Sequence, residues 1–166
     1  MPPLPAPPAH PTRLAYLGTP AIAVAPLRAL VAAGFDVAVV VTGEDKRRGR
    51  GGATTPTPVK AAAIDLGLPV AHDLDAALAA GADLGVVVAY GRILRRPFLE
   101  ALPCVNLHFS LLPRWRGAAP VERALLAGDD RTGVCVMAVE EGLDTGGVYA
   151  RAEVPIGPPA TAADLA

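Results

Sequence analysis

Short apolar runs alternate along the chain with segments whose apolar residues recur at helical spacing. Val-rich runs such as residues 36–42 and 83–89 predict strands buried on both faces, which is typical of a parallel sheet. Glycines that follow periodic segments mark helix ends, as Gly34 follows residues 27–33. The expected strands are 13–17, 36–42, 68–70, 83–89, 105–109, 134–139 and 148–154, and the expected helices are 27–33, 59–66, 74–80, 97–102 and 118–127. This alternation predicts an α/β fold with a Rossmann-like, doubly wound and mostly parallel sheet.

The composition and net charge indicate which classes of protein this chain can belong to. With 166 residues, 52% hydrophobic and 19% charged, residues 13–166 are expected to form one domain, and the prolines of residues 1–12 predict a disordered lead. A net charge of −1 provides no global attraction for nucleic acid, and the apolar runs are too short to span a membrane. Cys104 and Cys135 lie in apolar segments, which indicates buried free thiols and a reducing, cytoplasmic setting. A single Gly18 replaces the G-x-G-x-x-G fingerprint, so NAD binding is rejected.

The stretch of residues 104–120, CVNLHFSLLPRWRGAAP, combines polar side chains with a rigid loop. In a strand over residues 105–109, the period of two places Asn106 and His108 on the same face. Pro113 disfavours a helical Leu112 and fixes the loop that follows. Ligands of open α/β sheets bind at such strand ends, although an Asn-x-His pair is by itself more often a satisfied polar pair than a catalytic one.

Two motifs together extend this interpretation. NLHFSLLPRWRGAAP, followed by EGLDTG at residues 141–146, resembles the folate-dependent formyltransferases, and within them the methionyl-tRNA formyltransferases most closely. The resemblance covers residues 13–166 and implies a cytoplasmic, monomeric, metal-free enzyme. It would transfer a formyl group from 10-formyltetrahydrofolate to the amino group of initiator methionyl-tRNA, through a tetrahedral intermediate.

Formyl transfer requires donors for an oxyanion and a group that takes the proton of the amine. Asn106 and His108 are suitable donors, and Asp144 is the candidate base or orienting group. From the residues alone, Asp144 is interpreted as a turn-forming residue that precedes a turn with glycine. Only the family pattern pairs it with His108.

The resemblance also assigns folate contacts. They are the loop residues Ser110, Leu111, Leu112 and Pro113, and the strand-end residues Val88, Ala89, Tyr90 and Gly91. The alternative for the second group is a strand end packed by Tyr90. Phe109 departs from the family, which commonly has a small residue there, and its bulk could narrow the folate site. Gly147 is a second atypical position.

A basic, glycine-rich segment spans residues 43–58 and carries Lys46, Arg47, Arg48 and Arg50. A solvated loop without a partner is one interpretation, and a loop that orders around phosphates is the other. The resemblance favours the second, because the family places such a loop against the acceptor end of initiator tRNA.

The last residues predict a helix that has only begun. Residues 161–164 have the spacing of a capping box. The resemblance implies the same, because full chains of the family continue through more of the catalytic domain and a C-terminal β-barrel domain. The expectation is an N-terminal catalytic domain, incomplete and without that β-barrel domain. Two alternatives remain: a formyltransferase for a small amine such as glycinamide ribonucleotide or an amino sugar, and an inactive fragment that binds tRNA or folate.

Overall fold

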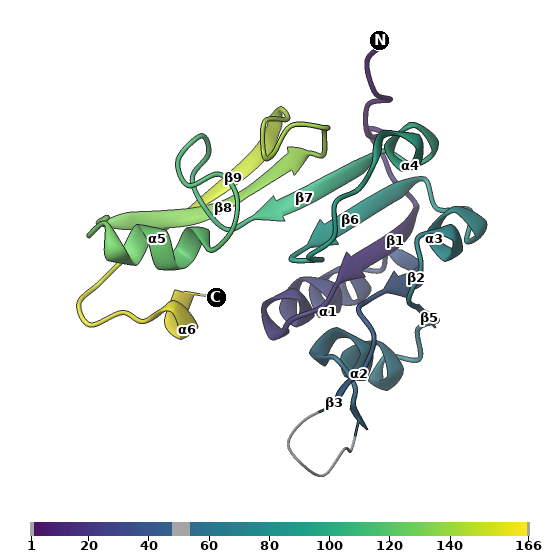
Figure 1. Cartoon of the computed structure of the whole chain (residues 1–166), viewed down its shortest axis with the longest axis horizontal. Coiled ribbons are helices and arrows are strands. Elements are labelled where there is room, and N and C mark those ends of the chain that lie inside the picture. The colour runs from purple at the N-terminus through teal and green to yellow at the C-terminus, as the bar shows by residue number, and fades with distance from the viewer. Residues whose placement is uncertain (1, 48–53, 166) are drawn as a thin grey trace. The chain divides into compact units, whose positions relative to one another are not determined.

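The computed structural model describes residues 2–47 and 54–165 (Figure 1). It divides the chain into two compact units, Met1–Cys104 and Val105–Ala166. Residues 2–12 form neither helix nor strand, as their prolines predict. In the described part of the chain, no helix combines the length and the hydrophobicity needed to cross a bilayer.

A parallel sheet forms the centre of the first unit. Its strands are β1 (Arg13–Gly18), β2 (Asp36–Val41), β5 (Val70–Ala71) and β6 (Leu84–Val88), in the order β5-β2-β1-β6. All three pairings are parallel. Strand β2, the next in the sequence, pairs with one edge of β1, and β6 pairs with its other edge. The order of the strands therefore reverses between β1 and β6, which border the switch point of a doubly wound sheet.

Short helices connect these strands (Figure 1). They are η1 (Ala21–Ala23), α1 (Val24–Ala32), α2 (Pro58–Asp65), α3 (Asp75–Ala79) and α4 (Arg96–Ala101). Thr57 caps α2, because its side chain accepts a hydrogen bond from the Lys60 amide at 3.1 Å. The core between helices and sheet is mostly aliphatic, and Tyr16 is its largest fully buried side chain.

Antiparallel strands dominate the second unit. Strand β7 (Cys104–His108) pairs with β8 (Arg131–Ala138), which pairs with β9 (Val148–Pro155). The unit also contains α5 (Pro120–Leu126) and α6 (Ala162–Leu165). The predicted capping box before α6 is formed in part: the Thr161 amide donates to the Asp164 carboxylate at 2.8 Å. The Thr161 hydroxyl donates to the same carboxylate at 2.6 Å, and the Asp164 amide donates to the Thr161 carbonyl.

The predicted α/β fold with a mostly parallel sheet is confirmed, with small differences at element ends. Helix α1 begins at Val24, three residues before the predicted start, because Pro26 fits within a first turn whose amides have no helical partner. A two-residue hairpin, β3 (Lys46–Arg47) with β4 (Thr54–Thr55), forms in the segment expected to be a loop.

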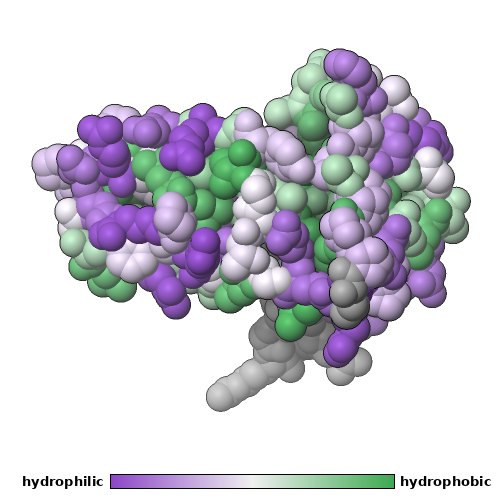
Figure 2. Space-filling view, turned by 90° about the horizontal axis from the view of Figure 1, so that it is seen from above, coloured by the Kyte–Doolittle hydropathy of each residue, from purple (hydrophilic) through white to green (hydrophobic). Residues whose placement is uncertain are grey.

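The surface mixes polar and apolar residues. Figure 2 shows hydrophobic residues bordered by hydrophilic ones on the face in view. Leu126 and Ile93 are the most exposed of the large hydrophobic residues, and single exposed side chains of this kind are common in soluble proteins.

Candidate functional site

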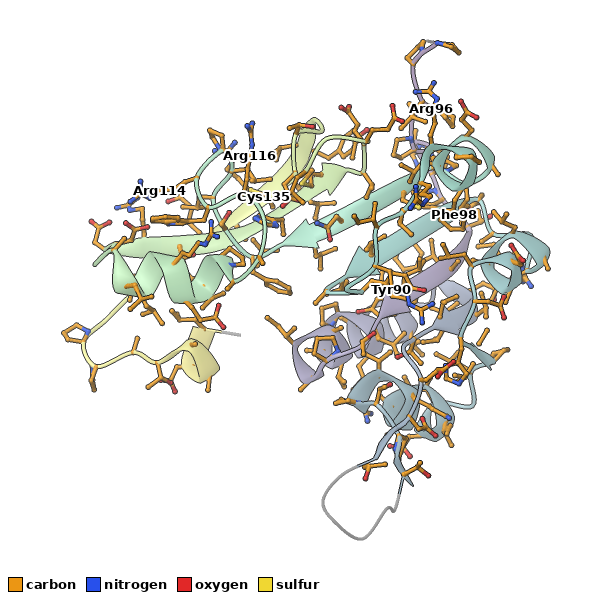
Figure 3. The ribbon with its side chains drawn as sticks, viewed as in Figure 1. Tyr90, Arg96, Phe98, Arg114, Arg116 and Cys135 are labelled. Carbon is orange, nitrogen blue, oxygen red and sulfur yellow. The ribbon has the colours of Figure 1, made fainter. Side chains whose placement is uncertain are left out.

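Strand β7 presents Asn106 and His108 on one face of the second unit. Asn106 lies opposite Met137 in the register with β8, and His108 lies opposite Cys135. Directly opposed residues of an antiparallel pair share a face, so the two polar residues stand beside Cys135 and Met137. These two side chains are buried and pack with Leu112, which comes from the loop after β7. Cys135 lies within β8 in Figure 3. Asn106 and His108 therefore lie beside buried apolar side chains on the same face of the sheet.

The loop after β7 folds back onto His108. The main-chain carbonyl of Trp115 lies 2.8 Å from His108 Nε2. A carbonyl only accepts, so Nε2 carries the proton of this hydrogen bond. Trp115 has a φ of 58°, in the left-handed region, which aims its carbonyl at the ring. The tautomer and orientation of His108 are thus set by the main chain of this loop.

Asp144 lies on the other side of the imidazole. Its Oδ2 is 3.5 Å from His108 Nδ1 and accepts a hydrogen bond from the Gly117 amide at 2.7 Å. The side chains of His108 and Asp144 are 7% and 13% exposed, so water screens their interaction weakly. The turn that carries Asp144 is closed by a hydrogen bond from the Ala138 amide to the Gly147 carbonyl. The structure therefore brings together two of the three residues assigned to catalysis.

Asn106 completes the arrangement by its position on the strand. It is two residues from His108, on the same face, and half-buried. Among residues 2–47 and 54–165, its carboxamide has no hydrogen-bond partner. An amide N–H, an imidazole nitrogen and a carboxylate beside that imidazole can bind a carbonyl oxygen and accept a proton. Because Nε2 is engaged by Trp115, Nδ1 is the ring nitrogen that can exchange its partner.

The loop residues assigned to folate differ in accessibility. Ser110 is fully buried, and its hydroxyl donates to the Arg114 carbonyl at 2.6 Å. Leu112 is buried against β8, whereas Leu111 is half-buried and Pro113 is exposed. Side-chain contacts with a ligand are therefore open to Leu111 and Pro113, and Ser110 and Leu112 shape the loop.

Residues 88–91 lie in the first unit, directly after β6 at the switch point of its sheet. Ala89 and Gly91 have positive φ values of 46° and 79°, and the Thr19 hydroxyl donates to the Tyr90 carbonyl at 3.3 Å. Tyr90 is buried and Ala89 is exposed. This turn offers main-chain amides and carbonyls, the groups that pair with the amide edge of a pterin ring.

The basic segment is described only in part. Lys46 and Arg47 form β3 and pair with Thr55 and Thr54 of β4, while Arg48 and Arg50 lie outside the described residues. In the part of the chain that the structure describes, no group of three or more His, Cys, Asp or Glu residues is arranged to hold a metal ion.

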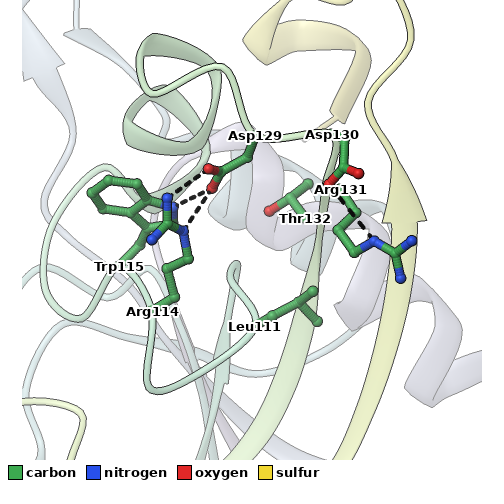
Figure 4. A pocket seen from close by; sticks show the side chains of 7 residues that line it. All are labelled: Leu111, Arg114, Trp115, Asp129, Asp130, Arg131 and Thr132. Carbon is green, nitrogen blue, oxygen red and sulfur yellow. Dashed lines mark hydrogen bonds and ion pairs between the residues drawn. The ribbon is translucent and has the colours of Figure 1, made fainter.

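Asp129 is a polar centre that the sequence did not indicate. Its carboxylate accepts hydrogen bonds from Arg114 Nε and Nη2 at 2.9 and 2.6 Å and from Trp115 Nε1 at 2.7 Å (Figure 4). The hydrogen bonds from Arg114, and then the one from Trp115, lower the pKa of Asp129 to about 2. Arg114 also stacks on the Trp115 ring at 4.5 Å. The sequence does not predict the contact between Asp129 and Arg114, because the two residues are separated in the chain and their spacing matches no motif.

A cavity of about 260 Å³ adjoins this group and is lined by residues of the loop and by residues 129–132 (Figure 4). The buried hydroxyl of Thr132 has no hydrogen-bond partner among the described residues. None of the three residues assigned to catalysis lines this cavity.

Comparisons with known proteins agree with the resemblance. The methionyl-tRNA formyltransferase of Symbiobacterium thermophilum is 51% identical over 163 residues, which cover 92% of this chain and 50% of that protein. The enzyme of the same name from Roseobacter denitrificans is 53% identical, over 92% of this chain and 53% of that protein. The chain thus spans about half the length of these curated relatives.

Solved structures show the same fold. Glycinamide ribonucleotide transformylase 1 from Symbiobacterium toebii aligns with a TM-score of 0.78 and 25% identity, over 95% of this chain and 80% of that one. The enzyme of the same name from Geobacillus kaustophilus gives 0.75 and 27%, over 94% and 89%. A sugar 3N-formyl transferase, WlaRD, solved in the presence of dTDP and 5-N-formyl-THF, gives 0.68 and 20%, over 95% and 57%. Residues 12–166 match the formyl transferase family, and with 51–53% identity to two of its enzymes the chain belongs to that family.

Proposed function

We propose that this chain carries out formyl transfer from 10-formyltetrahydrofolate to the amino group of initiator methionyl-tRNA, as part of a methionyl-tRNA formyltransferase. The observation that carries the proposal is the contact of 3.5 Å between His108 Nδ1 and Asp144, with Asn106 on the same strand face. Membership of the formyl transferase family makes this group the natural site for the reaction. The relatives of about 50% identity bear the name of this enzyme.

Each residue has a distinct task in the proposed reaction. The carboxamide of Asn106 donates to the formyl oxygen as negative charge develops on it, because its N–H groups have no partner among the described residues. The task of His108 is to present Nδ1, which lies 3.5 Å from Asp144, and the hydrogen bond from Nε2 to the Trp115 carbonyl holds the ring in this orientation. Asp144, held by the Gly117 amide, receives the proton that the amine loses.

The co-substrate contacts follow from the accessible groups of the assigned segments. We propose contacts with folate from Leu111 and Pro113, from the main chain of residues 110–113, and from the main chain of residues 88–91. The proposal assigns Lys46, Arg47, Arg48 and Arg50 to the phosphates of the acceptor end of the tRNA, since Arg and Lys bind phosphate through charge-assisted hydrogen bonds. Initiator tRNA is charged in the cytoplasm, so we propose that the protein acts there. We also propose that it acts as a monomer.

Glycinamide ribonucleotide is the second candidate substrate. Two solved transformylases for this small amine share 25% and 27% identity with the chain and its fold. The basic segment of residues 43–58 favours tRNA, because a small substrate does not require several cations on one loop.

The test compares acceptors in the presence of 10-formyltetrahydrofolate. Formyl transfer to charged initiator tRNA is expected, and transfer to glycinamide ribonucleotide alone would instead establish the second candidate. His108→Gln should lower the rate about 100- to 1,000-fold. His72→Gln is the matched control, because that imidazole contacts the Thr42 carbonyl and is not among the residues proposed for catalysis or for the folate contacts. A parent chain that formylates neither acceptor would refute the proposal.

A further inference from the structure

Asp129 holds two consecutive residues of the loop that covers His108. Its two oxygens accept three hydrogen bonds of 2.6–2.9 Å, two from the Arg114 guanidinium and one from the Trp115 indole. Its side chain is 14% exposed, although Arg114 is largely open to solvent. Stacking of Arg114 on the indole at 4.5 Å links the two donors to each other. Both side chains are thus fixed relative to one carboxylate (Figure 4).

The main chains of the same two residues contact the residues of the proposed site. The Arg114 carbonyl accepts the Ser110 hydroxyl at 2.6 Å, and the Trp115 carbonyl accepts His108 Nε2–H at 2.8 Å. Trp115 adopts a left-handed φ of 58°, which is unfavourable for a residue with a side chain. Such a conformation persists only when surrounding contacts fix it, and the Trp115 side chain donates a hydrogen bond to Asp129 and stacks with Arg114.

We propose that Asp129 is a positioning residue for formyl transfer: by holding Arg114 and Trp115, it keeps the Trp115 carbonyl on His108 Nε2 and leaves Nδ1 directed at Asp144. The inference rests on the proposed function of His108, and it adds a residue that touches neither substrate nor the imidazole. Without the carboxylate, the left-handed Trp115 relaxes, its carbonyl leaves Nε2, and the imidazole is free to rotate or change tautomer.

A purely structural role for Asp129 would stabilise the second unit without affecting the His108 ring. Long-range ¹H–¹⁵N NMR of the imidazoles separates the two roles, because it reports which ring nitrogen carries the proton. The chain contains three histidines, so His10→Gln and His72→Gln assign the His108 signals. The parent is expected to show the Nε2–H form with a slowly exchanging proton.

Asp129→Asn is the test, because the amide keeps the size of the side chain but presents only one acceptor oxygen to the three donors. Its expected result is loss of the slowly exchanging Nε2–H signal and a fall in kcat of about 10- to 100-fold with little change in KM. Asp130→Asn is the matched control, since that neighbouring carboxylate is 89% exposed and, among the described residues, forms an ion pair with Arg131 alone. It should leave the NMR signals and kcat at the parent values.

Trp115→Phe keeps the proposal testable if Asp129→Asn does not fold, because it deletes one donor and leaves the pair of Arg114 and Asp129 intact. A partial loss of the His108 signal is expected there. An unchanged His108 signal in the folded Asp129→Asn variant, or in the Trp115→Phe variant if the first is unfolded, would overturn the inference. The NMR result needs no substrate, so it stands or falls separately from the acceptor assay. A parent with the expected signal that formylates no amine counts against the proposed function alone.

Discussion

Two neighbouring glycines in the turn that carries Asp144 allow a sharp test of the proposed site. A Cβ added at Gly146 would lie 2.1 Å from the Ala138 carbonyl oxygen, whereas one added at Gly147 meets nothing within 4 Å. Neither glycine has a positive φ, so alanine can adopt the backbone conformation at both positions. At Gly146 the only unfavourable effect is the steric overlap of the added Cβ. The atom it meets belongs to the main chain of β8 and cannot turn away.

The size of the displacement follows from these distances. Real Cβ atoms essentially never approach closer than 3.0 Å, so the turn must move by about 0.9 Å to accept Gly146→Ala. Asp144 lies two residues away in this turn, and its hydrogen bond to the Gly117 amide is only 2.7 Å long. A misplacement of about 1 Å can cost 100-fold in rate, so we expect a loss of about that size in formyl transfer. Overpacking should also lower stability by about 1–3 kcal/mol.

The assay measures initial rates with 10-formyltetrahydrofolate and charged initiator tRNA, together with urea unfolding of each variant. Gly147→Ala is expected to match the parent in both measurements. The reason is that a Cβ added at Gly147, the position that departs from the family pattern, has no atom within 4 Å. Equal rates for Gly146→Ala and Gly147→Ala in folded protein would refute the argument that the turn places Asp144.

Three further predictions concern burial and charge. Tyr16 is fully buried and its hydroxyl donates to the Ala23 carbonyl at 2.5 Å, so Tyr16→Phe should cost about 1–3 kcal/mol in urea unfolding, while Tyr149→Phe, 59% exposed, should cost almost nothing. Burial raises the pKa of the Cys104 thiol to about 12, so iodoacetamide at pH 8 should leave it unmodified in the folded chain, and rapid alkylation seen by mass spectrometry would contradict its burial. The pKa of Asp129 is lowered to about 2, so its contribution to stability is present above the ordinary carboxyl value of 3.8 and is lost as the pH falls through about 2. The fluorescence of Trp115, the only tryptophan, should report that transition, and Arg114→Ala should move it toward 3.8.

Much of the fold was predictable because buried strands have a strong sequence signal. Strands β1, β2 and β6 lie within one residue of the predicted ends, since each is a continuous apolar run. Strand β8 was predicted three residues short, because it begins with Arg131, Thr132 and Gly133, which have low or mixed strand signals. The hairpin of β3 and β4 gives no periodic signal, because each strand has only two residues.

The candidate site was predictable to the extent that it depends on strand period. Alternation along β7 places Asn106 and His108 on one face, which the register with β8 confirms. The position of Asp144 beside His108 came only from the resemblance, because residues far apart in sequence leave no trace of their contact in one chain. The partners supplied by Trp115 and Gly117 were missed, since they are main-chain groups that every residue but proline has.

These main-chain partners change how the loop after β7 should be interpreted. The imidazole and the carboxylate are each held by a backbone group of residues 115–117, on either side of Arg116. Trp115 and Gly117 both have positive φ, so the loop conformation itself directs the carbonyl and the amide toward the pair. Side chains in this loop then affect the reaction mainly by fixing that conformation. In the Arg-Trp-Arg-Gly segment, the side chains of Trp115 and of the arginine before it bind Asp129, and the glycine allows the turn that presents its amide to Asp144.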